Sequence, residues 1–152
     1  MDSIYLGFTA FLFVLAVFDL ISGVSNDAVN FLNSAIGARV ATFKTIIIVA
    51  AAGVFLGASM SNGMMEVARH GVFHPSMFSF REVMFIFLAV MISDVILLDV
   101  FNTLGLPTST TVSMVFELLG GTFAMALVKS FSEQGVNMME MMNTGKALSM
   151  II

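Results

Sequence analysis

The chain has 152 residues, of which 59% are hydrophobic and 11% are charged. Typical soluble domains are about 45–50% apolar and about 25% charged, so this composition excludes a water-soluble globule with a polar surface. The formal net charge is −4 and the few basic residues form no stripe, which excludes nucleic acid as an expected partner. Cysteine is absent, which excludes disulfides and thiolate metal sites. The composition predicts an integral, all-α membrane protein that passes through the bilayer several times.

Four apolar runs are long enough to cross a bilayer, which takes about 20 mainly apolar residues in a helix. We predict membrane-spanning helices at residues 4–22, 45–61, 83–104 and 112–128. The segments 23–37 and 105–112 interrupt this pattern with polar residues, glycine and proline, and we expect both to be re-entrant or broken helices. Residues 1–129 then form one transmembrane unit. Residues 130–152 are expected to form an amphipathic linker and the start of a further helix, at which the chain is truncated.

The first polar segment places three asparagines on one face of a helix. Asn26, Asn30 and Asn33 follow one another at intervals of four and three residues, with Asp27 beside them. Their oxygens suit a hard cation such as sodium, and their amide N–H groups donate hydrogen bonds to an oxyanion. An ionised aspartate at bilayer depth costs at least about 2.5–3.5 kcal/mol, so it normally faces a partner or a watery cavity. The alternative is a polar loop at the membrane surface.

The second polar segment begins a helix. Gly105-Leu106-Pro107 ends the preceding apolar run, and the four hydroxyls of Thr108-Ser109-Thr110-Thr111 follow it. A helix N-terminus offers free N–H groups and the positive end of the helix dipole, which together bind tetrahedral anions. Ordinary N-capping is the alternative. Because a broken helix at membrane depth is tolerated only where it lines a cavity, the position favours a substrate site.

Acidic residues inside the spans are the third feature. Glu117 shares a helix face with Thr110 and Ser113, so we expect it to face the same polar cavity as the hydroxyls. The other acids in or near the spans are Asp19, Asp94 and Asp99. Each acid is a candidate cation ligand or proton carrier, although Asp19 and Asp99 could equally lie at the membrane interface. No nucleophile–base pair, P-loop or dinucleotide motif occurs, so we expect neither an enzyme nor a bound cofactor.

The two polar segments together resemble the motifs of the inorganic phosphate transporter family of the PiT type. That family carries Gly-x-Asn-Asp-x-x-Asn after its first span and Pro-x-Ser-Thr-Thr at the start of a later helix. Residues 24–30 and 107–111 are similar to these motifs, and the resemblance extends over roughly residues 19–121. Two positions differ: Val24 replaces the usual glycine, and Val112 replaces the histidine that commonly follows the hydroxyls.

The resemblance implies two inverted repeats, each with both motifs, whose re-entrant hairpins meet at a central site. Only one copy of each motif occurs here, so the chain is expected to be one repeat, with the second repeat of the polypeptide missing and a homodimer as the alternative. By resemblance, the phosphate contacts are Asn26 or Asp27 together with Ser109, Thr110 and Thr111. Sodium ligation would involve Asp27 and Asn30, and Glu117, from its position alone, completes the predicted cation-binding residues.

The expected function is secondary active transport of inorganic phosphate across the cell (inner) membrane, coupled to sodium or protons. A sodium ion is the candidate co-substrate. Transport of sulfate or another tetrahedral oxyanion by the same fold is one alternative. A carboxylate that touches the anion favours phosphate, because singly protonated phosphate can donate a hydrogen bond to it and sulfate cannot. A small, non-transporting membrane subunit is the other alternative.

Overall fold

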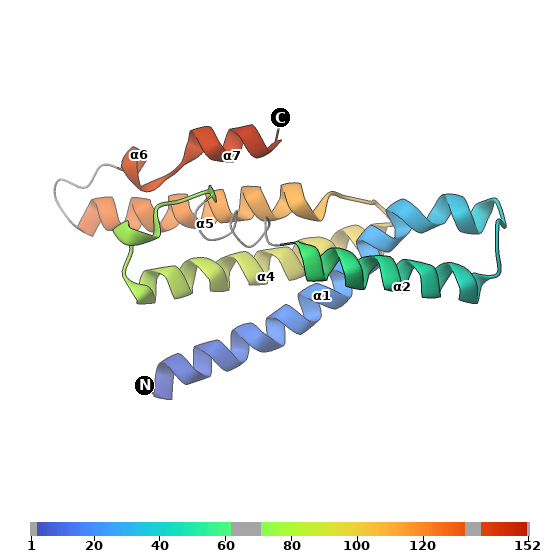
Figure 1. The fold of residues 1–152 in the computed structure, drawn as a ribbon. Coiled ribbons are helices and arrows are strands. Elements are labelled where there is room, and N and C mark those ends of the chain that lie inside the picture. Colours follow the sequence, from blue (N-terminus) through green and yellow to red (C-terminus); the bar gives the residue numbers. More distant parts are fainter. Residues whose placement is uncertain (1–2, 62–70, 133–137, 152) are drawn as a thin grey trace.

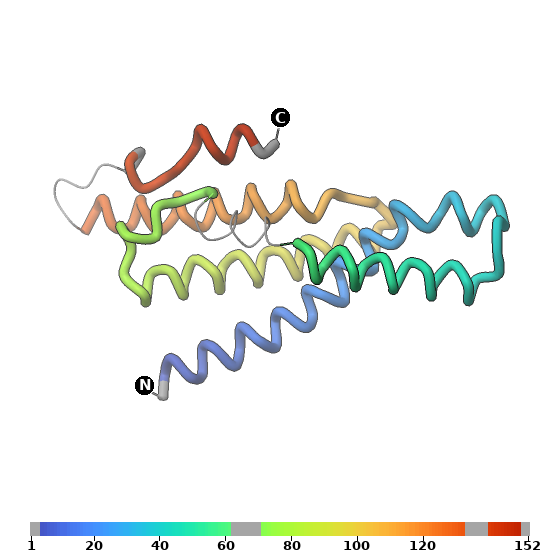
Figure 2. The backbone as a smooth tube through the Cα atoms, viewed as in Figure 1, coloured from blue at the N-terminus to red at the C-terminus, as the bar shows by residue number. Residues whose placement is uncertain are grey.

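The computed structural model describes residues 3–61, 71–132 and 138–151, which are mostly helical (Figures 1 and 2). The helices are α1 (Ser3–Gly37), α2 (Phe43–Met60), η2 (Pro75–Met77), α4 (Phe80–Leu104), α5 (Thr110–Ser132), α6 (Met138–Met141) and α7 (Thr144–Ile151). Within the described ranges, α1, α2, α4 and α5 are long and apolar enough to cross a membrane. Three of the four predicted spans lie within one of these helices, and the span 45–61 passes the end of α2 by one residue, so the prediction of an all-α fold with several membrane-spanning helices is confirmed.

Helix α1 continues through the position where the sequence predicts its end. The expected boundary between residues 22 and 23 is wrong, because Ser3–Gly37 form one helix. Gly23 is tolerated there, since glycine inside a helix costs only about 1 kcal/mol relative to alanine. The Ser25 hydroxyl donates to the Ile21 carbonyl at 2.7 Å, and such bonds often bend helices. In agreement with this, α1 changes direction near its middle (Figure 1).

Helices α4 and α5 form an antiparallel hairpin with well-defined ends (Figure 1). At the start of α4, the Ser79 hydroxyl accepts a hydrogen bond from the Glu82 N–H, and the Glu82 carboxylate accepts one from the Ser79 N–H. At the end of α4, Gly105 has a φ of 67°, in the left-handed region that favours glycine. The chain is then non-helical until Thr110. Of the interruption that the sequence predicts at 105–112, residues 105–109 are non-helical, whereas residues 110–112 already belong to α5.

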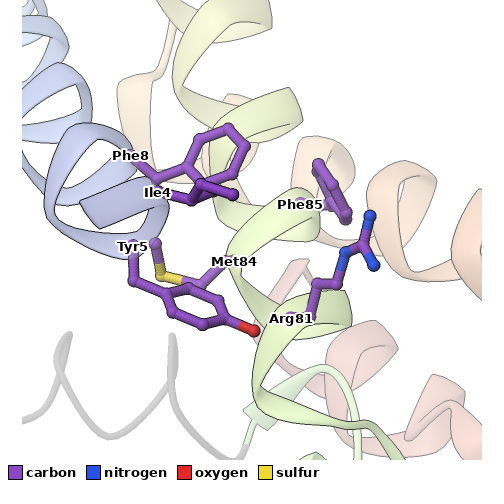
Figure 3. A pocket seen from close by; sticks show the side chains of 6 residues that line it. All are labelled: Ile4, Tyr5, Phe8, Arg81, Met84 and Phe85. Atoms are coloured by element: carbon purple, nitrogen blue, oxygen red, sulfur yellow. The ribbon is translucent and has the colours of Figure 1, made fainter. Parts of the chain in front are cut away.

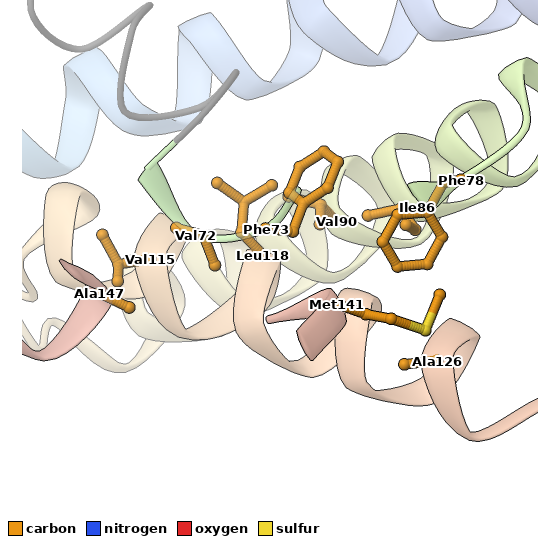
Figure 4. Close-up of a cluster of buried hydrophobic side chains, with 10 residues drawn as sticks. All are labelled: Val72, Phe73, Phe78, Ile86, Val90, Val115, Leu118, Ala126, Met141 and Ala147. Carbon is orange, nitrogen blue, oxygen red and sulfur yellow. The ribbon is translucent and has the colours of Figure 1, made fainter. Parts of the chain in front are cut away.

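The hydrophobic core joins side chains of α4 and α5 to side chains from three further places: the segments on either side of η2, α6 and α7 (Figure 4). Buried side chains recur every three or four residues along α4 and α5, so each helix turns one face to the other. The core side chains are Val72, Phe73, Phe78, Ile86, Val90, Val115, Leu118, Ala126, Met141 and Ala147. The predicted linker at 130–152 begins as the last turn of α5 and ends in α7, which packs back on α5.

The first half of α1 packs against the first half of α4 through aromatic side chains (Figure 3). The rings of Tyr5 and Phe80 meet edge to face, as do those of Phe8 and Phe85, and each pair of ring centres is 5.7 Å apart. The Arg81 guanidinium lies 5.6 Å from the centre of the Phe85 ring. A cavity of about 250 Å³ between the helices is lined by Ile4, Tyr5, Phe8, Arg81, Met84 and Phe85. These contacts fix how α1 crosses α4, and therefore which residues of α1 reach the turn between α4 and α5.

Large apolar side chains cover the outside of the bundle. Phe13, Phe55 and Phe131 are 72%, 73% and 85% exposed, and many other aliphatic and aromatic side chains share this surface. Soluble monomers rarely expose contiguous apolar patches larger than a few hundred Å². Lipid tails are as apolar as these side chains and solvate them without cost. The surface is therefore that of an integral membrane protein.

Candidate functional site

The two polar segments of the sequence meet in the structure at the turn between α4 and α5. Asn26 on α1 is 2% exposed and holds this turn. Its side-chain oxygen accepts a hydrogen bond from the Thr108 N–H at 3.2 Å, and its nitrogen donates to the Asn102 side-chain oxygen at 3.0 Å. The buried amide thus has a partner on each side, as burial of a polar group requires.

Asp27 and Asn30 extend this contact along α1. The Thr110 hydroxyl donates to the Asp27 carboxylate and lies 3.3 Å from each of its oxygens. The Asn30 nitrogen donates to the Thr108 carbonyl at 3.3 Å. Polar residues on one face of α1 therefore line the opening turn of α5. We call the group of Asn26, Asp27, Asn30, Thr108 and Thr110 the cradle.

Asn102 is a partner of the cradle that sequence reasoning did not assign. Besides its bond with Asn26, its side-chain nitrogen donates to the Ser22 carbonyl at 3.1 Å. It therefore joins the end of α4 to two successive turns of α1. The signal in the sequence was its position, because an amide inside an apolar helix, three residues before Gly105, needs a partner from another segment.

Ser109 and Thr111, which the family resemblance also assigns to phosphate, lie beside the cradle. The Ser109 hydroxyl accepts a hydrogen bond from the Val112 N–H at 3.4 Å, which is the N-capping role that the sequence left open as an alternative. Thr111 is exposed on the first turn of α5. Of the three hydroxyls predicted to contact phosphate, Thr110 is the one that the structure joins to α1. The binding roles of all three stay predictions.

A groove of about 470 Å³ runs along α4 and α5 from this turn. The residues that line it are Leu97, Phe101, Thr108, Ser109, Val112, Ser113, Phe116 and Glu117. Glu117 therefore shares a cavity with the hydroxyls, in the position that its helix face predicts. Its carboxyl group interacts with Asp94 and Asp19, and the structure does not bring it to the predicted sodium ligands Asp27 and Asn30.

The fold and the site together define a class of protein. Four apolar helices are long enough to cross a membrane, and polar groups from two distant parts of the chain, on α1 and at the turn between α4 and α5, meet where α5 begins. Buried polar side chains and interrupted helices are features from which membrane transporters build binding sites. The chain is therefore an integral, multi-pass membrane protein with the architecture of a transporter.

Comparison with protein families identifies the group within this class. The model of the phosphate transporter family matches residues 23–152, and the chain belongs to this family. The matched range includes both polar segments and all of α2, α4 and α5. The resemblance drawn from the two motifs is thereby confirmed, and this family is not one of enzymes. No curated protein and no solved structure matches the chain.

Proposed function

We propose that the chain forms one repeat of a secondary transporter that moves inorganic phosphate, driven by a gradient of sodium or protons. The observation that carries this proposal is the contact between Asp27 and Thr110 at the N-terminus of α5. It brings an acid and a hydroxyl from distant parts of the chain to a helix end, beside the amides of Asn26 and Asn30. Membership of the phosphate transporter family supports phosphate as the substrate.

The first turn of α5 supplies hydrogen-bond donors for an oxyanion. The first N–H groups of a helix have no acceptor within the helix, and the helix dipole adds about half a positive charge at this end. In α5, the Ser109 hydroxyl engages one of these groups, the N–H of Val112, and the Ser109 carbonyl accepts the first regular helical hydrogen bond, from the Ser113 N–H. The N–H groups of Thr110 and Thr111 come earlier in the same turn, and we assign them, with the Thr111 hydroxyl, to the bound phosphate. The single proton of the Thr110 hydroxyl is donated to Asp27 and holds that carboxylate beside the anion.

Asp27 favours phosphate over sulfate. A carboxylate next to a bound dianion repels it, unless the anion carries a proton that it can donate to the carboxylate. Singly protonated phosphate has such a proton at neutral pH and sulfate does not. The Asp27 carboxylate already accepts a hydrogen bond from the Thr110 hydroxyl, so it is placed to accept another from a ligand at the same helix end.

The cradle also offers oxygen ligands for a coupling cation. The Asp27 carboxylate and the Asn30 side-chain oxygen are hard donors of the kind that bind sodium. Because the Asn30 nitrogen donates to the Thr108 carbonyl, the oxygen is the atom of this amide that remains for a cation. A cation between Asp27 and Asn30 would offset the charge of the bound phosphate and so stabilise both.

The family resemblance supports a second, inverted repeat that completes the site. Transporters with inverted repeats hold their substrate near the middle of the bilayer, at discontinuous helices where the repeats meet. The interruption before α5 is such a discontinuity, and the cradle lies beside it. Rocking of one repeat against the other would then open the cradle to one side of the membrane at a time.

Uptake of radiolabelled phosphate by liposomes that contain the complete gene product tests the proposal. Thr110→Val removes the hydroxyl but keeps the shape of the side chain. We expect the apparent affinity for phosphate to fall by about tenfold to a hundredfold, as for the loss of a hydrogen bond to a charged group. Thr110→Ser keeps the hydroxyl and is the matched control, with an affinity close to that of the wild type.

Two further measurements separate the alternatives. Uptake that is unchanged in both Thr110→Val and Asp27→Asn would overturn the site assignment and favour a non-transporting subunit. Excess unlabelled sulfate should leave phosphate uptake intact, because sulfate cannot donate a hydrogen bond to Asp27. Full competition by sulfate would instead favour a general permease for tetrahedral oxyanions.

A further inference from the structure

A second group of polar side chains lies inside the bundle, away from the cradle. Asp19 of α1, Asp94 of α4 and Glu117 of α5 are close enough for their carboxyl groups to interact. Asp94 is only 6% exposed and interacts with both of the others. Its Oδ1 atom and both carboxyl oxygens of Glu117 are buried and have no hydrogen-bond donor in the described chain. We call these three residues the acid cluster.

The acid cluster lies at a constant distance from the cradle along all three helices. On each helix, one acid of the cluster is paired with a residue that belongs to the cradle or contacts it. The pairs are Asp19 and Asp27 on α1, Asp94 and Asn102 on α4, and Thr110 and Glu117 on α5. Seven or eight residues separate the members of each pair, which corresponds to roughly 10–12 Å along a helix. The cluster is therefore a separate layer, about two helical turns from the cradle.

The groove along α4 and α5 connects the two layers. Its lining begins at Thr108 and Ser109, at the opening turn of α5, continues past Ser113 and reaches Glu117. Both carboxyl oxygens of Glu117 are buried, so a charge there acts on an anion at the opening turn of α5 through the protein interior, where solvent screens it only weakly. This connection gives the acid cluster a direct route to influence the binding of phosphate.

The charges of the acid cluster are all of one sign. The charged groups that act on Asp94 are Asp19 and Glu117, and those that act on Glu117 are Asp19 and Asp94. Three ionised carboxylates at bilayer depth would repel one another, and each would cost at least about 2.5–3.5 kcal/mol. A bound cation removes this cost.

The geometry favours a proton as this cation. Among the residues that the structure describes, no group of three or more His, Cys, Asp or Glu side chains is arranged to hold a metal ion. A proton needs only two carboxyl groups in contact, because it converts one oxygen into a donor for the other. Shared between Asp94 and Glu117, it would be carried by one buried oxygen and donated to another.

We propose that Asp19, Asp94 and Glu117 form a proton-binding site whose proton moves together with phosphate. This inference rests on the proposed function. It adds that the coupling ion is a proton and that the proton binds at the acid cluster, away from Asp27 and Asn30. A proton on the acid cluster lowers the negative charge at the groove, and so stabilises an anion in the cradle. By linkage, phosphate in the cradle stabilises the proton by the same free energy.

Infrared spectroscopy of the purified complete gene product tests proton occupancy independently of transport. A protonated carboxyl group absorbs at a frequency distinct from that of a carboxylate, and we expect its band in the wild type at neutral pH. The double variant Asp94→Asn, Glu117→Gln should lose this band. Asp99→Asn is the matched control, because Asp99 is an exposed acid on the same helix, and it should keep the band. A wild type without the band, or a double variant that retains it in full, overturns the proposal.

Liposome assays test whether this proton drives transport. We expect Asp94→Asn to lose phosphate accumulation driven by a pH gradient but to keep the exchange of labelled phosphate without a gradient. Exchange requires no net movement of protons, and its retention also shows that the variant is folded. Asp99→Asn should keep both activities.

The outcomes of the liposome assays distinguish the two proposals. Accumulation that survives in Asp94→Asn, or that follows a sodium gradient alone in the wild type, overturns the proton site and leaves phosphate transport standing. A wild type with neither uptake nor exchange of phosphate contradicts the proposed function, and the coupling role of the acid cluster with it.

Discussion

At the scale of single residues, the cradle depends on Asn102. This amide accepts a hydrogen bond from the Asn26 side chain and donates one to the Ser22 carbonyl. The Asn26 amide in turn holds the Thr108 N–H. Three segments of the chain therefore meet through two side chains, and the position of Thr110 against Asp27 follows from this arrangement.

Replacement of Asn102 by alanine should lower the stability of the protein. The variant leaves the buried nitrogen of Asn26 without its acceptor, which costs about 1–3 kcal/mol. We expect a lower midpoint of thermal unfolding in detergent. Thr103→Ala is the control, because Thr103 is the exposed neighbour of Asn102 on the same helix. Equal midpoints for both variants would show that the amide contact does not stabilise the fold.

At the scale of secondary structure elements, the turn between α4 and α5 positions the start of α5. Gly105 ends α4 in a left-handed conformation, with its N–H directed to the carbonyls of Asn102 and Phe101. The Leu106 N–H also donates to the Phe101 carbonyl, at 2.9 Å. These bonds close the end of α4 and direct the chain towards the cradle, where Thr108 meets α1.

Gly105→Ala should destabilise this turn, because a side chain in the left-handed region costs about 1–2 kcal/mol. Space is not the cause, since no other atom lies within 4 Å of the position that a Cβ would occupy. Gly120→Ala is the matched control, since Gly120 lies within α5, also has an open Cβ position, and should gain helix stability. Thermal unfolding should place the Gly105 variant below the wild type and the Gly120 variant at or above it. The reverse order would contradict the role assigned to Gly105.

At the scale of the whole molecule, α1 is longer than one crossing of the membrane requires. Its 35 residues span about 52 Å, whereas the hydrocarbon core of a bilayer is about 30 Å thick. The first half packs on α4 through aromatic rings, and the polar second half meets the turn between α4 and α5. Figure 1 shows that the starts of α1 and α4 and the end of α5 lie towards one end of the bundle, with the connection from α1 to α2 at the other.

Cysteine labelling in intact membranes tests this arrangement, and the chain has no native cysteine to interfere. Single cysteines at Phe80 and Phe131, which are 68% and 85% exposed, should react with an impermeant reagent from the same side of the membrane, because α4 and α5 are antiparallel. A cysteine at Val40, which is 70% exposed, should react from the opposite side. Labelling of positions 80 and 131 from opposite sides would contradict the hairpin.

The sequence by itself determined that this protein lies in a lipid bilayer, and it identified the polar segments by which the family is recognised. Apolar runs of membrane-spanning length predict α2, α4 and α5 because hydropathy acts through the side chains of each run alone. Gly105 and Pro107 predict the interruption before α5 because their effects on the backbone are local. The two polar motifs, in order, likewise indicated the phosphate transporter family.

Only the tertiary structure decided which polar side chains act together. The sequence predicted a boundary at Gly23 from local preference, but the polar face of α1 finds partners in Asn102 and Thr108, so the helix continues. Glu117 shares a helix face with Thr110, yet its carboxyl group interacts with Asp94 and not with Asp27. Helical periodicity specifies the face on which a residue lies. The crossing angles and rotations of the helices, which depend on packing over the whole bundle, specify what that face meets.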